Sequence, residues 1–203
     1  MHTNYKKGFT LIELLIVIGI LAVLATVTLL VLNPAQMFAQ ARDSQRLSDL
    51  NTVKSAISLY LSTASSPVLD NSSGTLCGSR FWGTEATTTP TTLFGAARTT
   101  DVTPASPANT DGTGWVPVNF GTMSGGSPIS SLPLDPSGIS NGLNTNPSFA
   151  YYYACSTTQM TFKLIGNLES TAYSSGGSSD RESTDGGIYP NLYETGTNLS
   201  SGF

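Results

Sequence analysis

The residues best suited to chemistry are a glycine, an aromatic residue and one carboxylate at the start of a long apolar run. From Phe9 to Leu32 the only charged side chain is Glu13. A carboxylate costs about 2.5–3.5 kcal/mol at the centre of a membrane span and less near its end, so such groups usually have a partner. If the peptide bond after Gly8 is cut, the new amine of Phe9 lies about one helical turn from Glu13. The pattern favours maturation at Gly8, followed by pairing of Glu13 with the amine of a neighbouring copy, which sets the register of a filament.

The apolar run 9–32 is long enough to cross a membrane as a helix. At 1.5 Å per residue it extends about 36 Å, against a hydrocarbon core of about 30 Å. Lys6 and Lys7 precede it and hold the N-terminus in the cytoplasm, so the rest of the chain is expected outside. The alternatives are a secretory signal peptide with a cleavage site at Val23-Leu24-Ala25 and an ordinary single-span anchor. The first leaves the apolar residues after the site unexplained, and the second leaves the carboxylate unexplained.

The stretch Lys7-Gly8-Phe9-Thr10-Leu11-Ile12-Glu13 resembles the signature of type IV prepilins and type II secretion pseudopilins. The resemblance implies that a membrane prepilin peptidase cuts after Gly8 and methylates Phe9, and that Glu13 acts in assembly. It also implies the partners, which are identical or homologous pilin subunits in a helical filament and an ATPase-driven assembly platform in the inner membrane. The subunit is then expected as a single-pass protein of the inner (cytoplasmic) membrane, with its head outside, before it joins an extracellular or periplasmic filament.

A second helical pattern follows Asn33-Pro34, where the proline predicts a kink or a locally melted turn. Its apolar residues recur at the spacing of an amphipathic helix that ends near 62–66. These residues are Leu50, Val53, Ile57, Tyr60 and Leu61, preceded by Met37, Phe38 and Ala41 on compatible faces. The charged residues of the same segment are expected on the opposite face; they are Arg42, Asp43, Arg46, Asp49 and Lys54.

The remainder predicts a small head rich in strands and loops. Segments 149–155 and 160–166 are rich in strand-forming residues and are close enough for a hairpin, and 114–120 is a third strand or an extended segment. Segments 84–92 and 99–114 predict loops. The predicted fold class is α+β, in which a long N-terminal helix packs on a small antiparallel sheet with long loops, as in pilins. The expected parts are a leader (1–8), a transmembrane or filament-core helix (9–32), the amphipathic half of the helix (33–65) and the head (66–203).

Two weaker stretches resemble the C-terminal half of major pseudopilins. They are Ser131-Leu132-Pro133-Leu134-Asp135-Pro136 and Asn167-Leu168-Glu169-Ser170, on either side of the predicted hairpin. Residues 66–113 have no counterpart in this resemblance.

The chain has two further sets of residues that bind or crosslink in other proteins. Cys77 and Cys155 form a disulfide if the head is exported, or remain two buried thiols. Asp180, Glu182 and Asp185 lie in a glycine-containing stretch, and the resemblance implies a calcium loop in this part of the chain. The stretch lacks the order of an EF-hand loop, so a solvated acidic loop is the favoured interpretation.

Composition argues against catalysis and against nucleic-acid binding. Charged residues are 11% of the chain, and His2, the single histidine, lies in the leader. The sequence contains none of the common phosphate-binding, zinc or nucleophile motifs, so we do not expect an enzyme. The net charge of −4 and the absence of a basic stripe argue against specific binding of nucleic acid. The alternatives to a secretion or pilus filament are an adhesin or ligand-binding domain on a single-span anchor and a subunit of a DNA-uptake pilus.

Overall fold

The computed structural model describes residues 8–71, 76–78, 80–84, 100–102, 104–137, 139–140, 143–144 and 149–199. The leader residues 1–7 and nearly all of the predicted loop 84–92 lie outside these ranges. The chain forms two compact units, Met1–Phe38 and Ala39–Phe203.

The first helix, α1 (Leu11–Leu32), is apolar throughout except for Glu13 and two threonines. Its segment Leu11–Thr28 is long and apolar enough to cross a membrane, and none of that segment is buried within the protein. A core helix of this composition would be covered by other parts of its own chain. In the described part of the chain, the apolar side chains of Leu11–Thr28 are thus exposed.

The second helix, α2 (Pro34–Thr63), starts after one non-helical residue. Asn33 adopts the left-handed conformation with φ of 38°, which ends α1. Pro34 occupies the first helical position, where a backbone N–H has no partner to lose. The prediction of a break at Asn33-Pro34 is confirmed, and so is the predicted end of the helix near 62–66.

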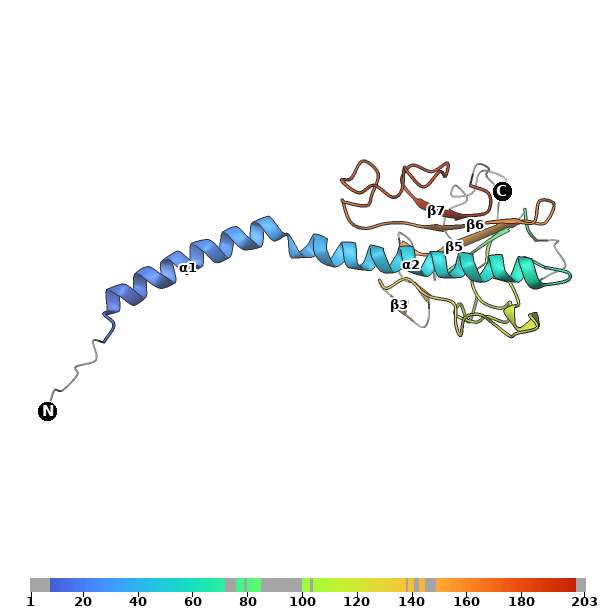
Figure 1. Ribbon diagram of the computed structural model, residues 1–203, viewed down its shortest axis with the longest axis horizontal. Helices are drawn as coiled ribbons and strands as arrows, with labels where there is room; N and C mark the ends of the chain where they lie inside the picture. Colours follow the sequence, from blue (N-terminus) through green and yellow to red (C-terminus); the bar gives the residue numbers. More distant parts are fainter. Residues whose placement is uncertain are drawn as a thin grey trace. The chain divides into compact units, whose positions relative to one another are not determined.

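The head contains a five-stranded sheet in the order β2-β1-β5-β6-β7, of which Figure 1 labels β5, β6 and β7. The strands are β1 (Arg80–Gly83), β2 (Thr100–Val102), β5 (Tyr152–Ser156), β6 (Thr161–Gly166) and β7 (Tyr193–Gly196). Neighbours from β1 to β7 are antiparallel, and β2 pairs in parallel with β1 at one edge. A separate pair, β3 (Ile139–Ser140) and β4 (Leu143–Asn144), completes the strands. The predicted α+β class is confirmed.

The predicted hairpin of 149–155 and 160–166 is confirmed as β5 and β6, with Tyr153 opposite Leu164. One other prediction needs correction, because the expected loop 99–114 contains β2. Of the two alternatives for 114–120, a strand or an extended segment, the strand is not formed; the segment is buried and leads into the short 3-10 helix Phe120–Thr122.

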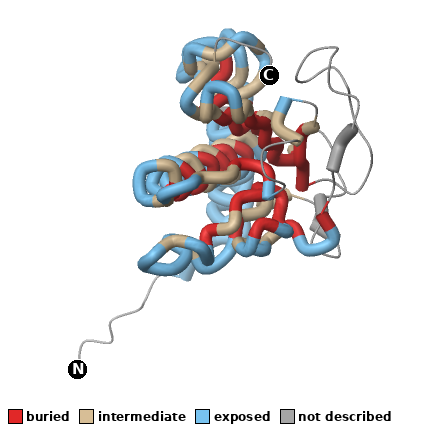
Figure 2. The backbone as a smooth tube through the Cα atoms, turned by 90° about the vertical axis from the view of Figure 1, so that its right-hand side faces the viewer, coloured by how far each residue is buried: buried red, intermediate tan, exposed pale blue. Residues whose placement is uncertain are grey.

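The core lies where α2 and the segment around Trp115 meet one face of the sheet (Figure 2). Residues alternate between faces along β5, as in any strand. Tyr151, Tyr153 and Cys155 join this core, whereas Tyr152 and Ala154 pack on the opposite face with Ile165 in a second, smaller cluster. The main core also contains Leu50, Val53, Ala56, Ile57, Tyr60, Leu69, Trp82, Val116, Val118, Phe120, Leu132, Phe162 and Leu164. The predicted apolar face of α2 is thus confirmed at Leu50, Val53, Ile57 and Tyr60.

Candidate functional site: the N-terminal segment and the charges of the head

The bond between Gly8 and Phe9 lies in exposed, non-helical chain just before α1. Phe9 is 90% exposed, and a side-chain carbon added at Gly8 would contact nothing within 4 Å. A protease must bind its substrate as an accessible, extended strand, which a bond inside a helix does not offer. The predicted cleavage site is therefore exposed and lies outside the helix.

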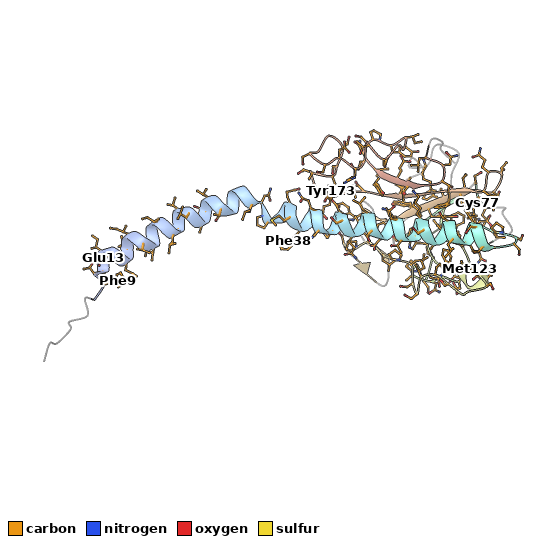
Figure 3. All side chains as sticks on the ribbon, viewed as in Figure 1. Phe9, Glu13, Phe38, Cys77, Met123 and Tyr173 are labelled. Atoms are coloured by element: carbon orange, nitrogen blue, oxygen red, sulfur yellow. A yellow bond between two sulfur atoms is a disulfide. The ribbon has the colours of Figure 1, made fainter. Side chains whose placement is uncertain are left out.

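Glu13 lies one turn into α1, near Phe9 (Figure 3). Its carboxylate accepts hydrogen bonds from the backbone N–H and the hydroxyl of Thr10, both at 2.8 Å. The Thr10 hydroxyl in turn accepts the N–H of Glu13 at 3.3 Å. This reciprocal arrangement is a capping box, which satisfies backbone donors at the start of a helix. It fixes the helix start at Leu11 and leaves the bond after Gly8 outside the helix.

Thr10 is thus a functional candidate that the motif analysis did not single out. The spacing Thr-x-x-Glu before an apolar run is itself the sequence signal of a capping box. The charge of Glu13 predicted a role in assembly, whereas its hydrogen bonds to Thr10 were not predicted.

A second charged cluster lies in the larger unit and centres on Arg46. Its guanidinium is fully buried and pairs with Asp43 at 2.7 Å and with Asp135 at 2.6 Å, and both carboxylates are also buried. The Ser137 hydroxyl accepts a further hydrogen bond at 2.6 Å, and the Phe149 ring lies 4.7 Å from the guanidinium carbon. The expectation that Arg46 and Asp43 lie on an exposed face is wrong, because their partners come from loops distant in sequence.

The cluster extends to the loop that follows β6. Asp43 accepts the backbone N–H groups of Glu169 at 2.8 Å and Ser170 at 2.7 Å, and Arg42 pairs with the Glu169 carboxylate. The hydrogen bond from Arg42 lowers the pKa of Glu169. Burial opposes the charge of Arg46, but its hydrogen bonds to Asp135 and Asp43 outweigh burial and raise its pKa. The cluster ties α2 to the loop segments that contain Asp135 and Glu169.

Comparison with protein families bears on the N-terminal segment. Residues 3–29 match the family model for the prokaryotic N-terminal methylation motif. The chain carries the hallmark motif of type IV prepilins and pseudopilins. No curated protein and no solved structure gives a significant match to this chain. The matched range covers the predicted cleavage site, the capping box and most of α1.

The head of this motif-bearing chain contains the disulfide that the sequence left open. Cys77 and Cys155 are bonded, with Cα atoms 4.9 Å apart and a separation of 78 residues along the chain. Cys155 is fully buried in the main core, and Cys77 packs at its edge (Figure 3). The bond fixes the start of the β1 region to the central strand β5. Structural disulfides of this kind are typical of proteins exported from the cytoplasm.

The three candidate calcium ligands do not converge on a shared site. Among the described residues, no three His, Cys, Asp or Glu side chains are grouped closely enough to hold a metal ion. Instead, every oxygen of the three carboxylates accepts a hydrogen bond from the protein. Asp180 accepts hydrogen bonds from the N–H groups of Gly176, Glu182 and Ser183 and from the Ser183 hydroxyl. Glu182 accepts the backbone N–H groups of Leu168 and Ser175. Asp185 accepts the backbone N–H groups of Gly187 and Glu194. In this arrangement they do not fit a calcium ion.

Proposed function

We propose that this protein is the precursor of a structural filament subunit of the type IV pilus or type II secretion pseudopilus kind. In this proposal, prepilin peptidase cuts it between Gly8 and Phe9 and methylates Phe9, and it then assembles through α1. The observation that supports this most directly is that the prepilin motif at 3–29 coincides with an apolar helix whose segment Leu11–Thr28 is exposed among the residues that the structure describes. Lipid covers its apolar side chains before assembly, and neighbouring subunits cover them in the filament.

The head supports the same route through its cysteines. The disulfide and the Lys6–Lys7 pair before the helix agree on topology, since a disulfide persists outside the cytoplasm and the basic residues remain inside it. The proposed subunit is therefore a single-pass protein of the cytoplasmic membrane with its head outside. Its proposed partners are other subunits, the peptidase and the assembly platform.

Maturation is tested by intact mass measurement of the protein purified from filaments or from membranes. We expect the loss of residues 1–8 and the addition of one methyl group. A membrane protein that keeps residues 1–8 would instead support a single-span anchored adhesin. A mature N-terminus at Thr26 would show a secretory signal peptide and overturn the proposal.

In a filament, two kinds of partner would compete for the Glu13 carboxylate, namely Thr10 of the same chain and the terminal amine of a neighbouring subunit. The capping box satisfies the Glu13 carboxylate within its own chain by neutral donors at Thr10. Hydrogen bonds from neutral donors leave the negative charge in place, and that charge attracts an amine in an apolar layer. Glu13 therefore has two separable properties, its capping geometry and its charge, and we propose that the charge sets the register between subunits.

Three variants separate these properties. Glu13→Gln keeps the capping box, since glutamine serves at this position, but removes the charge. Thr10→Ala weakens the cap and keeps the charge, and Glu13→Ala removes the charge and the carboxylate half of the capping box while the Thr10 hydroxyl still accepts the N–H of residue 13. We expect filaments from Thr10→Ala, and no filaments but membrane-inserted subunit from the two Glu13 variants, as seen by shearing and electron microscopy. Filaments from Glu13→Gln and none from Thr10→Ala would show that the cap, and not the charge, is required.

A further inference from the structure

A second buried cation, Lys163, lies at the centre of the C-terminal part of the head. Its side chain extends from β6 toward the smaller core cluster and is fully buried. The ammonium donates to the Glu194 carboxylate at 2.7 Å and to the Leu199 carbonyl at 3.0 Å. The Tyr189 ring lies 5.6 Å from the ammonium nitrogen. The Lys163 ammonium thus lies close to groups from β7, from the segment before β7 and from the segment after β7.

The surroundings of Glu194 show that this pair is built into the fold. Glu194 is 1% exposed, and its second carboxylate oxygen accepts the Tyr189 N–H at 2.8 Å. A side-chain carbon added at Gly187 would lie 1.9 Å from that oxygen, so only glycine leaves room for the carboxylate. The Glu194 N–H donates to Asp185, one of the candidate calcium ligands.

The oxygen atoms around Lys163 are of the kind that bind a cation, and the cation that they contact is the Lys163 ammonium. A carboxylate oxygen and a carbonyl oxygen are hard ligands of the type that calcium takes. Here the ammonium already neutralises the carboxylate. Burial raises the pKa of Asp185, the Glu194 charge raises it further, and Lys163 opposes the increase. The ammonium thus acts on both acidic residues of this region.

We propose that Lys163 is the built-in counter-ion of segment 185–199 and replaces a bound divalent cation there, so that the segment folds without calcium. The resemblance to major pseudopilins implied a calcium loop in this part of the chain, and the geometry of Lys163 and the three carboxylates disagrees with it. The proposal does not depend on filament assembly.

The test is amide hydrogen exchange of segment 185–199 in the full-length protein in detergent, with and without a calcium chelator and with millimolar calcium. We expect the exchange of wild-type protein to be the same in all three conditions. Lys163→Met leaves Glu194 buried without a counter-charge, so exchange should become faster by on the order of a hundredfold.

The double variant Lys163→Met/Glu194→Gln removes both charges and keeps their volumes. We expect it to recover much of the lost protection, because no uncompensated charge remains. The double variant also supplies the test if Lys163→Met alone does not fold. Loss of protection in wild-type protein on chelation, or unchanged protection in Lys163→Met, would overturn the proposal. A double variant that exchanges as fast as Lys163→Met would overturn it as well.

Discussion

The helices α1 and α2 differ in the side chains that they expose and bury. In α1 the apolar side chains are exposed, for example Leu11 at 82% and Leu15 at 57%. In α2 two charged side chains, Asp43 and Arg46, are completely buried. An exposed apolar helix indicates a surface that binds a membrane or another protein chain. A buried, fully paired charge indicates a contact within the fold whose loss is strongly destabilising. Hydrophobicity alone would have predicted that the apolar residues of α1 are buried and that the charged residues of α2 are exposed.

The largest effect on stability is expected when the buried ion pairs of Arg46 are removed. Arg46→Ala leaves Asp43 and Asp135 buried without their counter-charge, which costs about 3–5 kcal/mol of unfolding free energy. Thermal unfolding of the full-length protein in detergent, followed by the fluorescence of the buried Trp82 and Trp115, measures this. The variant Arg46→Met/Asp43→Asn/Asp135→Asn neutralises the cluster and should recover part of the loss. An unchanged melting temperature in Arg46→Ala would contradict the assignment of the cluster as a structural anchor.

A somewhat smaller effect is expected from the disulfide. Replacing both Cys77 and Cys155 by alanine opens a covalent loop of 78 residues. The expected cost is about 2–4 kcal/mol, mainly because the unfolded chain gains conformational freedom. Denaturant unfolding of the double variant and of wild-type protein with a reductant measures it. Equal stability of oxidised wild-type protein and the double variant would show that the core alone fixes β1 to β5.

A local, pH-dependent effect is expected at Asp180. Hydrogen bonds from the Ser183 hydroxyl and from the N–H groups of Gly176 and Ser183 lower the pKa of Asp180 to about 2. Because the folded pKa lies below the ordinary value of about 4, the carboxylate stabilises its loop above pH ~4. This contribution is lost as the pH falls from about 4 to about 2.

Amide exchange of residues 176–183, corrected for the intrinsic rate, tests this prediction. Asp180→Asn should reduce protection at pH 7, and the difference from wild-type protein should vanish near pH 2. A difference that stays the same at both pH values would show that the charge of Asp180 has no part in holding the loop.

The smallest effect on the head is expected from α1. Leu15→Ala removes an apolar side chain that is 57% exposed. The free energy of unfolding of the head should change by less than about 0.5 kcal/mol, as it does for substitutions at other exposed positions. The same change should weaken filaments, where neighbouring copies cover this surface in our proposal. A large loss of head stability would show that α1 serves folding and not association.

The sequence predicted the features that depend on local patterns. The break at Asn33-Pro34, the end of α2 and the hairpin of β5 and β6 follow from a proline, an apolar period and two adjacent strand-forming runs. The strands β1 and β7 were not predicted, because each has only four residues and forms through pairing with a distant strand.

The burial of Arg46 was missed for a related reason. Its partner Asp135 lies 89 residues away, so nothing near Arg46 in the sequence distinguishes it from a solvated arginine. The carboxylates of the candidate calcium stretch were grouped by their closeness in sequence, although their hydrogen-bond donors include Leu168 and Glu194 outside it. At the N-terminal site the roles of Gly8, Phe9 and Glu13 stay predictions, whereas the capping contact of Thr10 was not predicted.

The two edges of the sheet have a consequence for solubility. A strand edge has unpaired backbone groups and can pair with the same edge of another molecule, which produces aggregates. The edge strand β7 has four residues and carries the inward-pointing charge of Glu194, while β2 at the other edge has three residues. Short strands and an inward charge discourage such edge-to-edge pairing. Among the described strands, both edges of the sheet thus have features that disfavour association of two molecules through their sheets.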